Sequence, residues 1–291
     1  NPVIFDDIRQ ENYGWVLLEK LQEYTDTDYY YHWSNSHIGY GKYNEGVAII
    51  TRHKIKEEDE FYCTFAQSVR TISSRRIVSI TIDYNGQEIE FYSCHMNLPN
   101  CETEDMGKSI QNILTRTKND NLKILMGDFN TDAIGSSEDY KNIISQGLFD
   151  TYTLAEKKDS GITVDKSIDG WANDKSQKRI DYIFSNKEIK VKESKVIFNN
   201  ENKKIVSDHF GVEVTLPKQH SWEAARNLAL TKVGDLGIDS KPFIGTLAVS
   251  DGYGKVVGRI SSDGKKGWRL DYDPKKGMHI NVFDYTKGKS D

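Results

Sequence analysis

Four short polar motifs lie at the ends of apolar runs, and each contains side chains that could take part in catalysis. They are residues 93–97 (Ser-Cys-His-Met-Asn), 127–130 (Gly-Asp-Phe-Asn), 179–184 (Arg-Ile-Asp-Tyr-Ile-Phe) and 207–209 (Ser-Asp-His). Strand ends and the loops that follow them carry a large share of functional residues. We therefore expect the four motifs to converge on one site.

The side chains in these motifs have distinct chemical abilities. Asp128 and Asn130 project to the same side of an extended chain, so a carboxylate that holds or deprotonates water would stand beside an amide that donates to an oxyanion. His209 suits acid–base work or phosphate stabilisation near neutral pH. Asp181 could orient the imidazole of His209, and His95 brings a second imidazole. Taken singly, each has a simpler interpretation as a turn cap, a local ion pair or a structural histidine.

The segments between the motifs predict the elements that must position them. We expect strands at residues 3–5, 46–51, 76–84, 89–95, 122–126, 180–184, 190–198 and 212–216, and helices at 11–24, 106–118, 139–146 and 222–233. Asn85-Gly86 predicts a tight hairpin turn. Hairpin-paired strands with interspersed helices indicate an α/β (α+β) fold, a four-layer sandwich of two mixed sheets flanked by helices.

Composition and charge change along the chain. Residues 1–216 contain 26 Lys/Arg and 35 Asp/Glu, whereas residues 217–291 contain 13 and 9. We therefore predict a large acidic domain over 1–216 and a small, basic, Gly-rich α+β domain over 217–291. No apolar run approaches the roughly 20 residues that cross a bilayer, which predicts a soluble protein. The compartment stays open, secretion or delivery as an effector included. The three cysteines predict reduced thiols, with a Cys94–Cys101 pair as the alternative.

The sequences of the four motifs and their order along the chain resemble those of the endonuclease/exonuclease/phosphatase superfamily. This is the DNase I-like group that also includes AP endonucleases and neutral sphingomyelinases. The resemblance covers residues 1–216, and residues 45–50 (Glu-Gly-Val-Ala-Ile-Ile) are similar to that family's Gly-Val-Ala-Ile strand. It implies that His209 contacts the scissile phosphate as general base or transition-state stabiliser, and that Asp181 orients it. It also implies that Asp128 positions the attacking water, that Asn130 binds a phosphate oxygen and that His95 is the second active-site histidine.

The same resemblance implies a divalent cation, with Mg²⁺ expected and Mn²⁺ or Ca²⁺ as alternatives, to neutralise charge on the pentacoordinate phosphate. Asp208 would support this metal site. Members of the family begin with an Asn-bearing strand, followed by a strand that ends in a Gln-Glu pair whose Glu holds the metal. Here the first strand is absent and Asp7 stands where the Glu is expected. Asp is also an oxygen ligand, but its side chain is one methylene shorter.

For the substrate, the resemblance favours a nuclease that acts on DNA or RNA. Arg179 and Arg76 would bind the backbone, and Arg75 and Arg70 lie near them in the sequence. One alternative is a phosphodiesterase for a lipid or small phosphoester, of the sphingomyelinase kind. Another is a catalytically weakened, toxin-associated binding protein, which Asp7 and the absent first strand would explain.

Residues 267–282 carry a different signal. Gly-Trp-Arg-Leu-Asp-Tyr-Asp-Pro, followed by Gly-Met-His-Ile-Asn-Val, resembles the C-terminal toxin modules of bacterial polymorphic toxins. That resemblance implies a small RNase with His279, Arg269 and His220 as candidates, and a delivered effector with an immunity protein as its partner. The alternative is a basic β module that binds nucleic acid, another partner or the first domain.

Overall fold

The computed structural model of the chain describes residues 12–84, 86–135, 137–166, 176–217, 222–246, 253–273 and 277–287. Asn1–Pro217 and Lys218–Asp291 form two compact units, which we call the first and the second unit. The strand expected at residues 3–5 lies outside the described residues, as do Asp7, Asn85 and His220.

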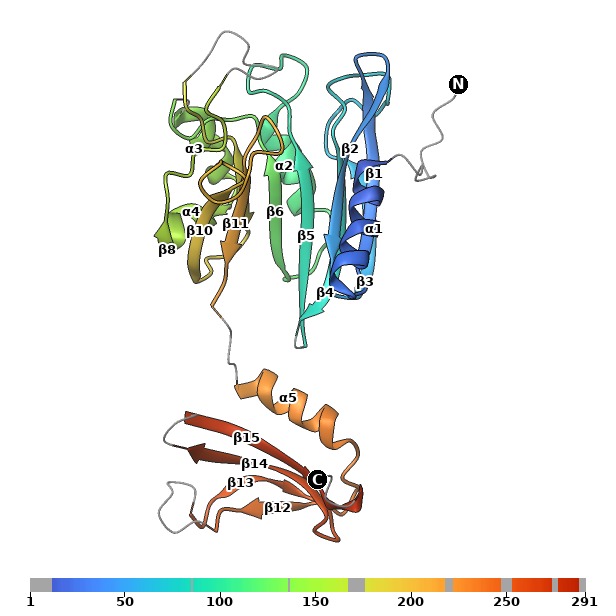
Figure 1. Cartoon of the computed structure of the whole chain (residues 1–291), viewed down its shortest axis with the longest axis vertical. Helices are drawn as coiled ribbons and strands as arrows, with labels where there is room; N and C mark the ends of the chain where they lie inside the picture. Colours follow the sequence, from blue (N-terminus) through green and yellow to red (C-terminus); the bar gives the residue numbers. More distant parts are fainter. Residues whose placement is uncertain are drawn as a thin grey trace. The chain divides into compact units, whose positions relative to one another are not determined.

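In the described part of the first unit, the strands form three sheets (Figure 1). One is mixed and six-stranded, in the order β3-β4-β5-β6-β9-β7; the others are β1-β2 and β11-β10-β8. The strands are β1 (Tyr30–Gly39), β2 (Tyr43–Thr51), β3 (Ile55–Tyr62), β4 (Arg76–Tyr84), β5 (Gln87–His95), β6 (Leu122–Asp128), β7 (Phe149–Asp150), β8 (Ala155–Lys158), β9 (Asp181–Ser185), β10 (Val191–Ile197) and β11 (Gly211–Thr215). Parallel strands β5 and β6 end at His95 and Asp128, and antiparallel β9 begins at Asp181. Three of the four motifs therefore meet at one edge of this sheet.

Both faces of the six-stranded sheet are covered. Helices α2 (Met106–Leu114) and α3 (Ser137–Ser145) pack on one face around Ile110, Ile113 and Ile143. The β1–β2 hairpin packs on the other face, and helix α1 (Tyr13–Thr25) contacts that hairpin. This arrangement confirms the expected α/β sandwich. The second sheet differs from the expectation because, among the described residues, β1-β2 and β8-β10-β11 are separate ladders.

Strand β4 shows how the sequence pattern builds these layers. Val78, Ile80 and Ile82 alternate along the strand and pack in the core beneath the β1–β2 hairpin, together with Val47 and Ile49. Ile77 points to the opposite face and joins the core under the helices. Side chains that alternate in a strand face opposite sides, so a strand buried on both faces must be apolar at most positions.

Two strands had no clear signal in the sequence. β3 is rich in Glu and Asp. In β1, four consecutive polar residues, Ser34 to His37, are all buried. Neither therefore shows the apolar alternation that identifies a half-buried strand. Near the start of β1, Tyr31 packs against Trp15 and donates to Asn12 Oδ1.

Helix α2 is shorter than the expected helix over 106–118. Its N-terminus is capped by Asp105, whose side chain accepts from the backbone N–H of Lys108. After Leu114 the hydroxyl of Thr115 donates to the carbonyl of Gln111. Thr117 and Asn119 then turn away to donate to the buried carboxylate of Glu90 on β5. These tertiary hydrogen bonds end the helix although the local sequence would allow it to continue.

The second unit consists of helix α5 (Trp222–Val233) and a four-stranded antiparallel sheet in the order β12-β13-β14-β15. The strands are β12 (Lys241–Ile244), β13 (Val256–Ile260), β14 (Lys266–Asp273) and β15 (Gly277–Asp284). α5 contacts β14 and β15 and buries Ala229 and Val233. Of the helices in the described part of the chain, none is long and apolar enough to cross a membrane.

Candidate active site

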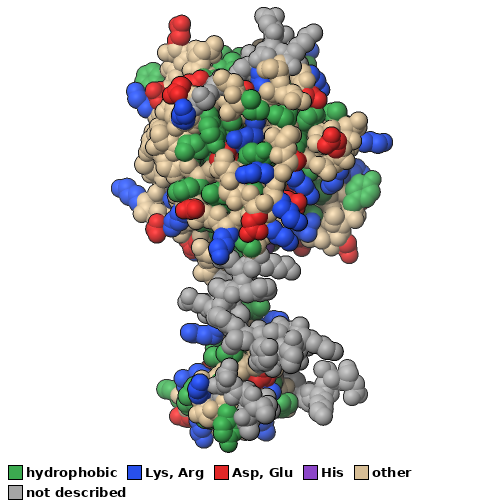
Figure 2. All heavy atoms as spheres, turned by 90° about the vertical axis from the view of Figure 1, so that its left-hand side faces the viewer, with side chains coloured by type: hydrophobic (Ala, Val, Ile, Leu, Met, Phe, Trp, Pro, Cys, Tyr) green, Lys and Arg blue, Asp and Glu red, His purple; other side chains and the backbone are tan. Residues whose placement is uncertain are grey.

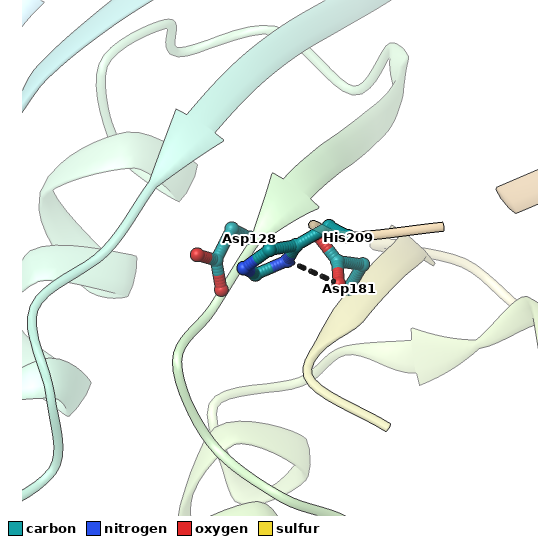
Figure 3. A group of neighbouring side chains, drawn as sticks. All are labelled: Asp128, Asp181 and His209. Atoms are coloured by element: carbon teal, nitrogen blue, oxygen red, sulfur yellow. Dashed lines mark hydrogen bonds and ion pairs between the residues drawn. The ribbon is translucent and has the colours of Figure 1, made fainter. Parts of the chain in front are cut away.

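His209 and Asp181 form the central pair of the site. Nδ1 of His209, in the turn before β11, lies 2.9 Å from Oδ2 of Asp181, the first residue of β9. A carboxylate oxygen accepts, so Nδ1 carries a proton and donates it to this contact. Figure 3 shows the opposite ring nitrogen of His209 on the side of Asp128. The pair thus fixes the direction in which the imidazole presents its second nitrogen.

Asp128 completes a compact acidic group at the end of β6. One ligand atom from each of Asp128, Asp181 and His209 lies within 4.8 Å of the others. Burial, followed by the charge of Asp181, raises the pKa of Asp128 to about 7. The backbone N–H of Asn130 donates to Oδ1 of Asp128 at 2.7 Å and holds this carboxylate in place.

The neighbouring carboxylates also raise the pKa of His209, and for an imidazole this favours the charged form. Burial disfavours its charged form, but the hydrogen bond and the charge of Asp181 outweigh burial, and Asp128 and Asp208 add to the effect. The pKa of His209 is raised to about 9. The imidazole is therefore a cation at neutral pH, which suits a group that faces a phosphate.

The donor set fits a divalent cation. Asp128 and Asp181 are close enough for their negative charges to disfavour each other, as the raised pKa of Asp128 shows. A cation between them would remove that repulsion. Carboxylate oxygens are the ligands that hard cations such as Mg²⁺ prefer. His209 is already held by Asp181, so we assign the cation to the carboxylates and leave the imidazole for the substrate.

Arg75 brings a positive charge to the other side of the site. It directly precedes β4, and its Nε donates to Oδ1 of Asn97 at 2.8 Å, while Nη1 lies 3.5 Å from Nδ1 of His95. The carbonyl of Ser73 accepts from the amide of Asn97. From the sequence, Arg75 was one of several arginines near the site and Asn97 had no role. The signal that singles them out is their position at the ends of neighbouring strands.

His95 lies between Arg75 and Asp128, with Nε2 3.7 Å from Oδ2 of Asp128. Partial burial, reinforced by the charge of Arg75, lowers the pKa of His95 to about 3, although 40% of its side chain stays exposed. His95 is therefore neutral at physiological pH, and its Nδ1 is available to accept from Arg75. The structure thus brings His95, Asp128, Asp181 and His209 together as the sequence predicted.

Asn130 and Asp208 are placed differently from the expectation. Asn130 is buried in a left-handed conformation (φ 49°), and its amide donates to the carbonyl of Met96 at 2.9 Å. It ties the loop after β6 to the loop after β5, and its contact with a phosphate oxygen stays a prediction. Asp208 is exposed, accepts from Ser207 and does not join the Asp128–Asp181–His209 group. Because Asp7, the other expected metal ligand, lies outside the described residues, a role of Asp208 in the metal site stays a prediction.

Arg76 does not face the site, which corrects its expected role in substrate binding. Its Nη2 donates to Oε1 of Glu60 at 3.1 Å, and its guanidinium lies 5.2 Å from the ring centroid of Tyr62. Both partners belong to β3. Arg76 has the parity of Val78 and Ile80, whose side chains lie on the sheet face under the β1–β2 hairpin, whereas Arg75, before β4, reaches His95.

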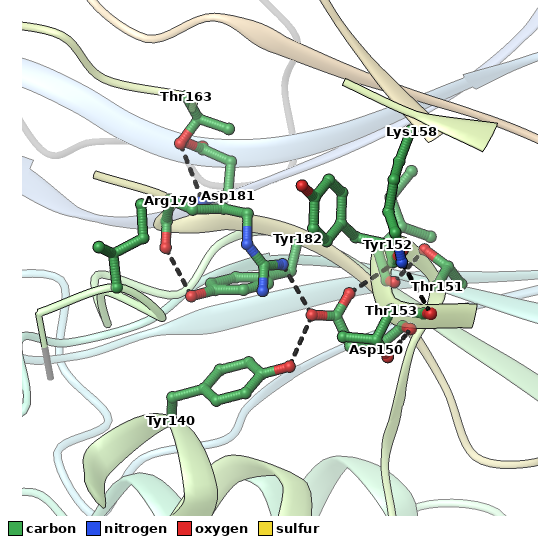
Figure 4. Close-up of polar contacts among 12 residues, drawn as sticks. Tyr140, Asp150, Thr151, Tyr152, Thr153, Lys158, Thr163, Arg179, Asp181 and Tyr182 are labelled. Atoms are coloured by element: carbon green, nitrogen blue, oxygen red, sulfur yellow. Dashed lines mark hydrogen bonds and ion pairs between the residues drawn. The ribbon is translucent and has the colours of Figure 1, made fainter. Parts of the chain in front are cut away.

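Arg179 is also turned inward, against the expectation that it binds substrate. Nη1 donates to Oδ2 of Asp150 at 2.7 Å, and the two side chains are only 9% and 1% exposed. Figure 4 shows the guanidinium among the aromatic rings that surround it, with Tyr140 donating to the same oxygen of Asp150. The ring centroids of Tyr140, Tyr152 and Tyr182 lie 4.5–5.5 Å from the guanidinium carbon. Arg179 is part of the core.

Replacing Arg179 by methionine should therefore destabilise the fold. The substitution leaves Asp150 buried without its cation, which typically costs about 3–5 kcal/mol in the free energy of unfolding. Urea denaturation would measure the loss. Lys195→Met is a matched control, because Lys195 pairs with Glu213 on the surface and should change stability by less than about 1 kcal/mol. An Arg179→Met variant with normal stability but a raised KM would show that Arg179 binds the substrate.

Two of the second-unit candidates, Arg269 and His279, lie on one hairpin, while His220 lies outside the described residues. His279 pairs with Asp271 across the β14–β15 ladder, and Arg269 pairs with Asn281. Nε of Arg269 donates to Oδ2 of Asp271 at 2.8 Å, and the amide of Asn281 donates to the same oxygen. Arg269 is thus engaged within the sheet, and an RNase role for it and His279 stays a prediction.

The family model of the endonuclease/exonuclease/phosphatase family matches residues 7–209. A solved protein of that family from Leptotrichia buccalis is 82% identical, covering 75% of this chain and 82% of its own, with a TM-score of 0.70. A mannosyl-6-phosphatase from Bacteroides thetaiotaomicron is 22% identical, covering 69% and 80%, with a TM-score of 0.52.

A third solved structure, the 3′ phosphatase NExo from Neisseria bound to a product DNA hairpin, is 14% identical, covering 73% and 86%, with a TM-score of 0.50. These last two likenesses show the fold alone. No curated protein matches the sequence. The family match covers all four motifs, and their His and Asp side chains meet at one sheet edge. The chain belongs to the endonuclease/exonuclease/phosphatase family.

Proposed function

We propose that the first unit is a divalent-cation-dependent hydrolase that attacks a phosphoester with water. The observation that carries the proposal is the His209–Asp181 pair facing Asp128 at one sheet edge. The family includes both nucleases and phosphatases, as the names of the structural relatives show. Family membership therefore supports phosphoester hydrolysis and leaves the substrate to be argued from the site.

Each residue of the group has a separate task in this proposal. Asp181 holds the imidazole of His209 by accepting from Nδ1, and it favours the charged ring. His209 then donates from Nε2 to a phosphate oxygen as negative charge builds in the transition state. Asp128, fixed by the backbone N–H of Asn130, orients the attacking water. A cation held by Asp128 and Asp181 would supply further charge neutralisation at the phosphate.

Arg75 and His95 form the opposite wall of the phosphate site. The guanidinium of Arg75 is fixed through Nε by Asn97, and it lies beside the neutral ring of His95. Guanidinium groups bind phosphate through paired N–H donors. We therefore propose that Arg75 binds a non-bridging phosphate oxygen. The positive wall at Arg75 and the negative wall at Asp128 and Asp181 would orient the phosphate between them.

Within phosphoesters, we propose a small substrate that is bound at a single phosphate. A polymer of nucleic acid is usually gripped at several phosphates by several cations. Here Arg76 and Arg179, the two arginines expected to provide that grip, are paired with Glu60 and Asp150. Residues 1–216 carry nine more acidic than basic side chains. On the face shown in Figure 2, acidic and basic side chains of the described residues are interspersed.

Nuclease activity is the second candidate. It rests on the resemblance of the motifs to DNase I-like enzymes and on the DNA product bound in the NExo structure of the same fold. Supercoiled plasmid DNA and total RNA, incubated with the chain and Mg²⁺, would test it directly. Cleavage of either that is lost with His209→Ala would favour the nuclease over the small phosphoester.

Arg75→Ala tests the phosphate site. We expect KM for a small phosphoester such as p-nitrophenyl phosphate to rise at least about 10-fold, because a charged hydrogen bond to a phosphate is removed. Arg75→Lys should recover only part of the loss, since lysine lacks the paired donors. Arg70→Ala, a neighbouring arginine in the same loop, serves as control and should leave KM unchanged. An unaltered KM in Arg75→Ala would remove this residue from the site.

A further inference from the structure

A buried histidine near the site faces two hydrogen-bond acceptors. His37, near the end of β1, is 1% exposed. Its Nδ1 lies 3.1 Å from the backbone carbonyl oxygen of Ser74, and its Nε2 lies 3.2 Å from Oε2 of Glu45 on β2. The side chain of Glu45 fills the space beside Gly39, where an added Cβ would lie 1.6 Å from Oε1. Gly39 is therefore required for this contact.

The chemistry of these partners determines how many protons the ring carries. A backbone carbonyl accepts only, and so does an ionised carboxylate. A neutral imidazole has one N–H and would leave one nitrogen lone pair against an acceptor, which is costly in a buried position. The carboxylate of Glu45 is 35% exposed, and contact with water favours its charged form. The additional proton therefore belongs on the ring of His37.

The contact matters because it holds the segment that carries Arg75. Ser74, whose carbonyl binds His37, is the residue directly before Arg75. Two further bonds join β1 to this segment: Ile38 N–H donates to the carbonyl of Val69 at 2.7 Å, and Arg76 N–H donates to the hydroxyl of Ser36 at 3.1 Å. The backbone on both sides of Arg75 is thus anchored to β1.

The charges around His37 also influence the phosphate site. The carboxylate of Glu45 on β2 interacts electrostatically with the guanidinium of Arg75. The charges of Arg75 and His37 both disfavour a charged ring at His95 on β5. A charged His37 balances Glu45. Without that balance, the carboxylate would offset the guanidinium of Arg75 and weaken its attraction for a phosphate.

We infer that His37 is held as an imidazolium by Glu45 and the Ser74 carbonyl, and that it positions Arg75 for the substrate phosphate. His37 is a positioning residue, because it acts through Arg75 and does not reach the reacting atoms. The positioning role rests on the proposed function of the first unit, whereas the protonation state of His37 does not.

Nitrogen-15 NMR of the histidine rings tests the protonation state without any activity. In the wild-type protein at pH 7 we expect both ring nitrogens of His37 to bear protons, with the signals assigned by their absence in His37→Gln. In Glu45→Gln we expect a neutral ring with a single N–H. A neutral ring in the wild-type protein would overturn the inference, even if the protein hydrolyses phosphoesters.

Kinetics tests the positioning role. His37→Gln should raise KM for p-nitrophenyl phosphate about 5- to 10-fold and leave kcat within about twofold, because it removes the donor to the Ser74 carbonyl and leaves the charge of Glu45 unbalanced beside Arg75. In an Arg75→Ala background it should add no further effect, because both substitutions act on the same phosphate contact. His32→Gln, on the same strand and paired with exposed Glu58, is the control and should not change KM. An unchanged KM in folded His37→Gln would contradict the positioning role.

Failure of the inference and failure of the proposed function give different results. If the wild-type protein hydrolyses no phosphoester, the proposed function is contradicted. If both ring nitrogens of His37 still bear protons, the inference that His37 is an imidazolium stands. Binding of inorganic phosphate, measured by titration calorimetry, would then replace the kinetic test. The positioning role predicts a 5- to 10-fold weaker affinity in His37→Gln by the same argument, and equal affinities would overturn it.

Discussion

Replacing His209 by alanine is expected to lower kcat for phosphoester hydrolysis about 10³-fold, the upper range for loss of one preorganised transition-state donor. The imidazole is fixed by Asp181 at 2.9 Å and is charged at neutral pH. Its contact strengthens only as the phosphate gains negative charge, so KM should change little. Initial rates over a range of substrate concentrations would separate the two constants.

The pH dependence provides a second readout of the same residue. Because the pKa of His209 is raised to about 9, its charged form is present below that value and is lost as the pH rises through it. A charged stabiliser therefore predicts activity that falls as the pH rises through the pKa of His209, which a cation bound to Asp128 and Asp181 would lower from its metal-free value. His53→Ala, at an exposed histidine in the same unit, should retain full activity. A His209→Ala variant whose kcat is within tenfold of the wild-type value would show that His209 does not stabilise the transition state.

Removal of divalent cations is expected to reduce hydrolysis to background. Without a cation, the imidazolium of His209 balances only part of the charge of Asp128 and Asp181, and Asp128 takes up a proton near neutral pH. Dialysis against EDTA, followed by activity assays, would measure the loss, and added Mg²⁺ should restore the rate.

A stability measurement separates cation binding from catalysis. Mg²⁺ should raise Tm of the wild-type protein, because a ligand that binds only the folded state stabilises it by mass action. Asp128→Asn should reduce that shift, since it removes one of the two facing carboxylates. Full activity after exhaustive EDTA treatment would show that the carboxylates do not act through a cation.

The meeting of the candidate residues could be predicted from the sequence because His95, Asp128 and Asp181 each lie at one end of a strand with a clear apolar pattern. β5, β6 and β9 are neighbours in one sheet, so His95, Asp128 and Asp181 had to meet once those strands paired. His209 joins them from the turn before β11. Asp7, the expected metal ligand, lies outside the described residues and stays a prediction.

The arginines could not be assigned from the sequence, because their partners are distant along the chain. Arg179 is two residues from Asp181, yet its partner Asp150 is 29 residues away and its environment includes tyrosines from three segments. Arg75 and Arg76 are adjacent, but only the first reaches His95. Local sequence gives the charge of an arginine, whereas tertiary packing decides which carboxylate neutralises it.

The fold was least predictable where polar residues are buried. Ser34 to His37 form the middle of β1 with almost no exposure, so the strand lacks the alternation by which strands are recognised. The end of α2 depends on Glu90, which lies on a strand that precedes the helix in sequence. Both features follow from tertiary hydrogen bonds, which a local pattern does not contain.

The most direct test is phosphate release from p-nitrophenyl phosphate by the wild-type chain and His209→Ala, each with Mg²⁺ or EDTA, and with plasmid DNA and total RNA as parallel substrates. We predict Mg²⁺-dependent release from the small phosphoester that is lost in His209→Ala, while both nucleic acids stay intact. Mg²⁺-dependent cleavage of DNA or RNA would contradict the small substrate and favour nuclease activity. Hydrolysis that survives both EDTA and the substitution would contradict the assignment of the active site itself.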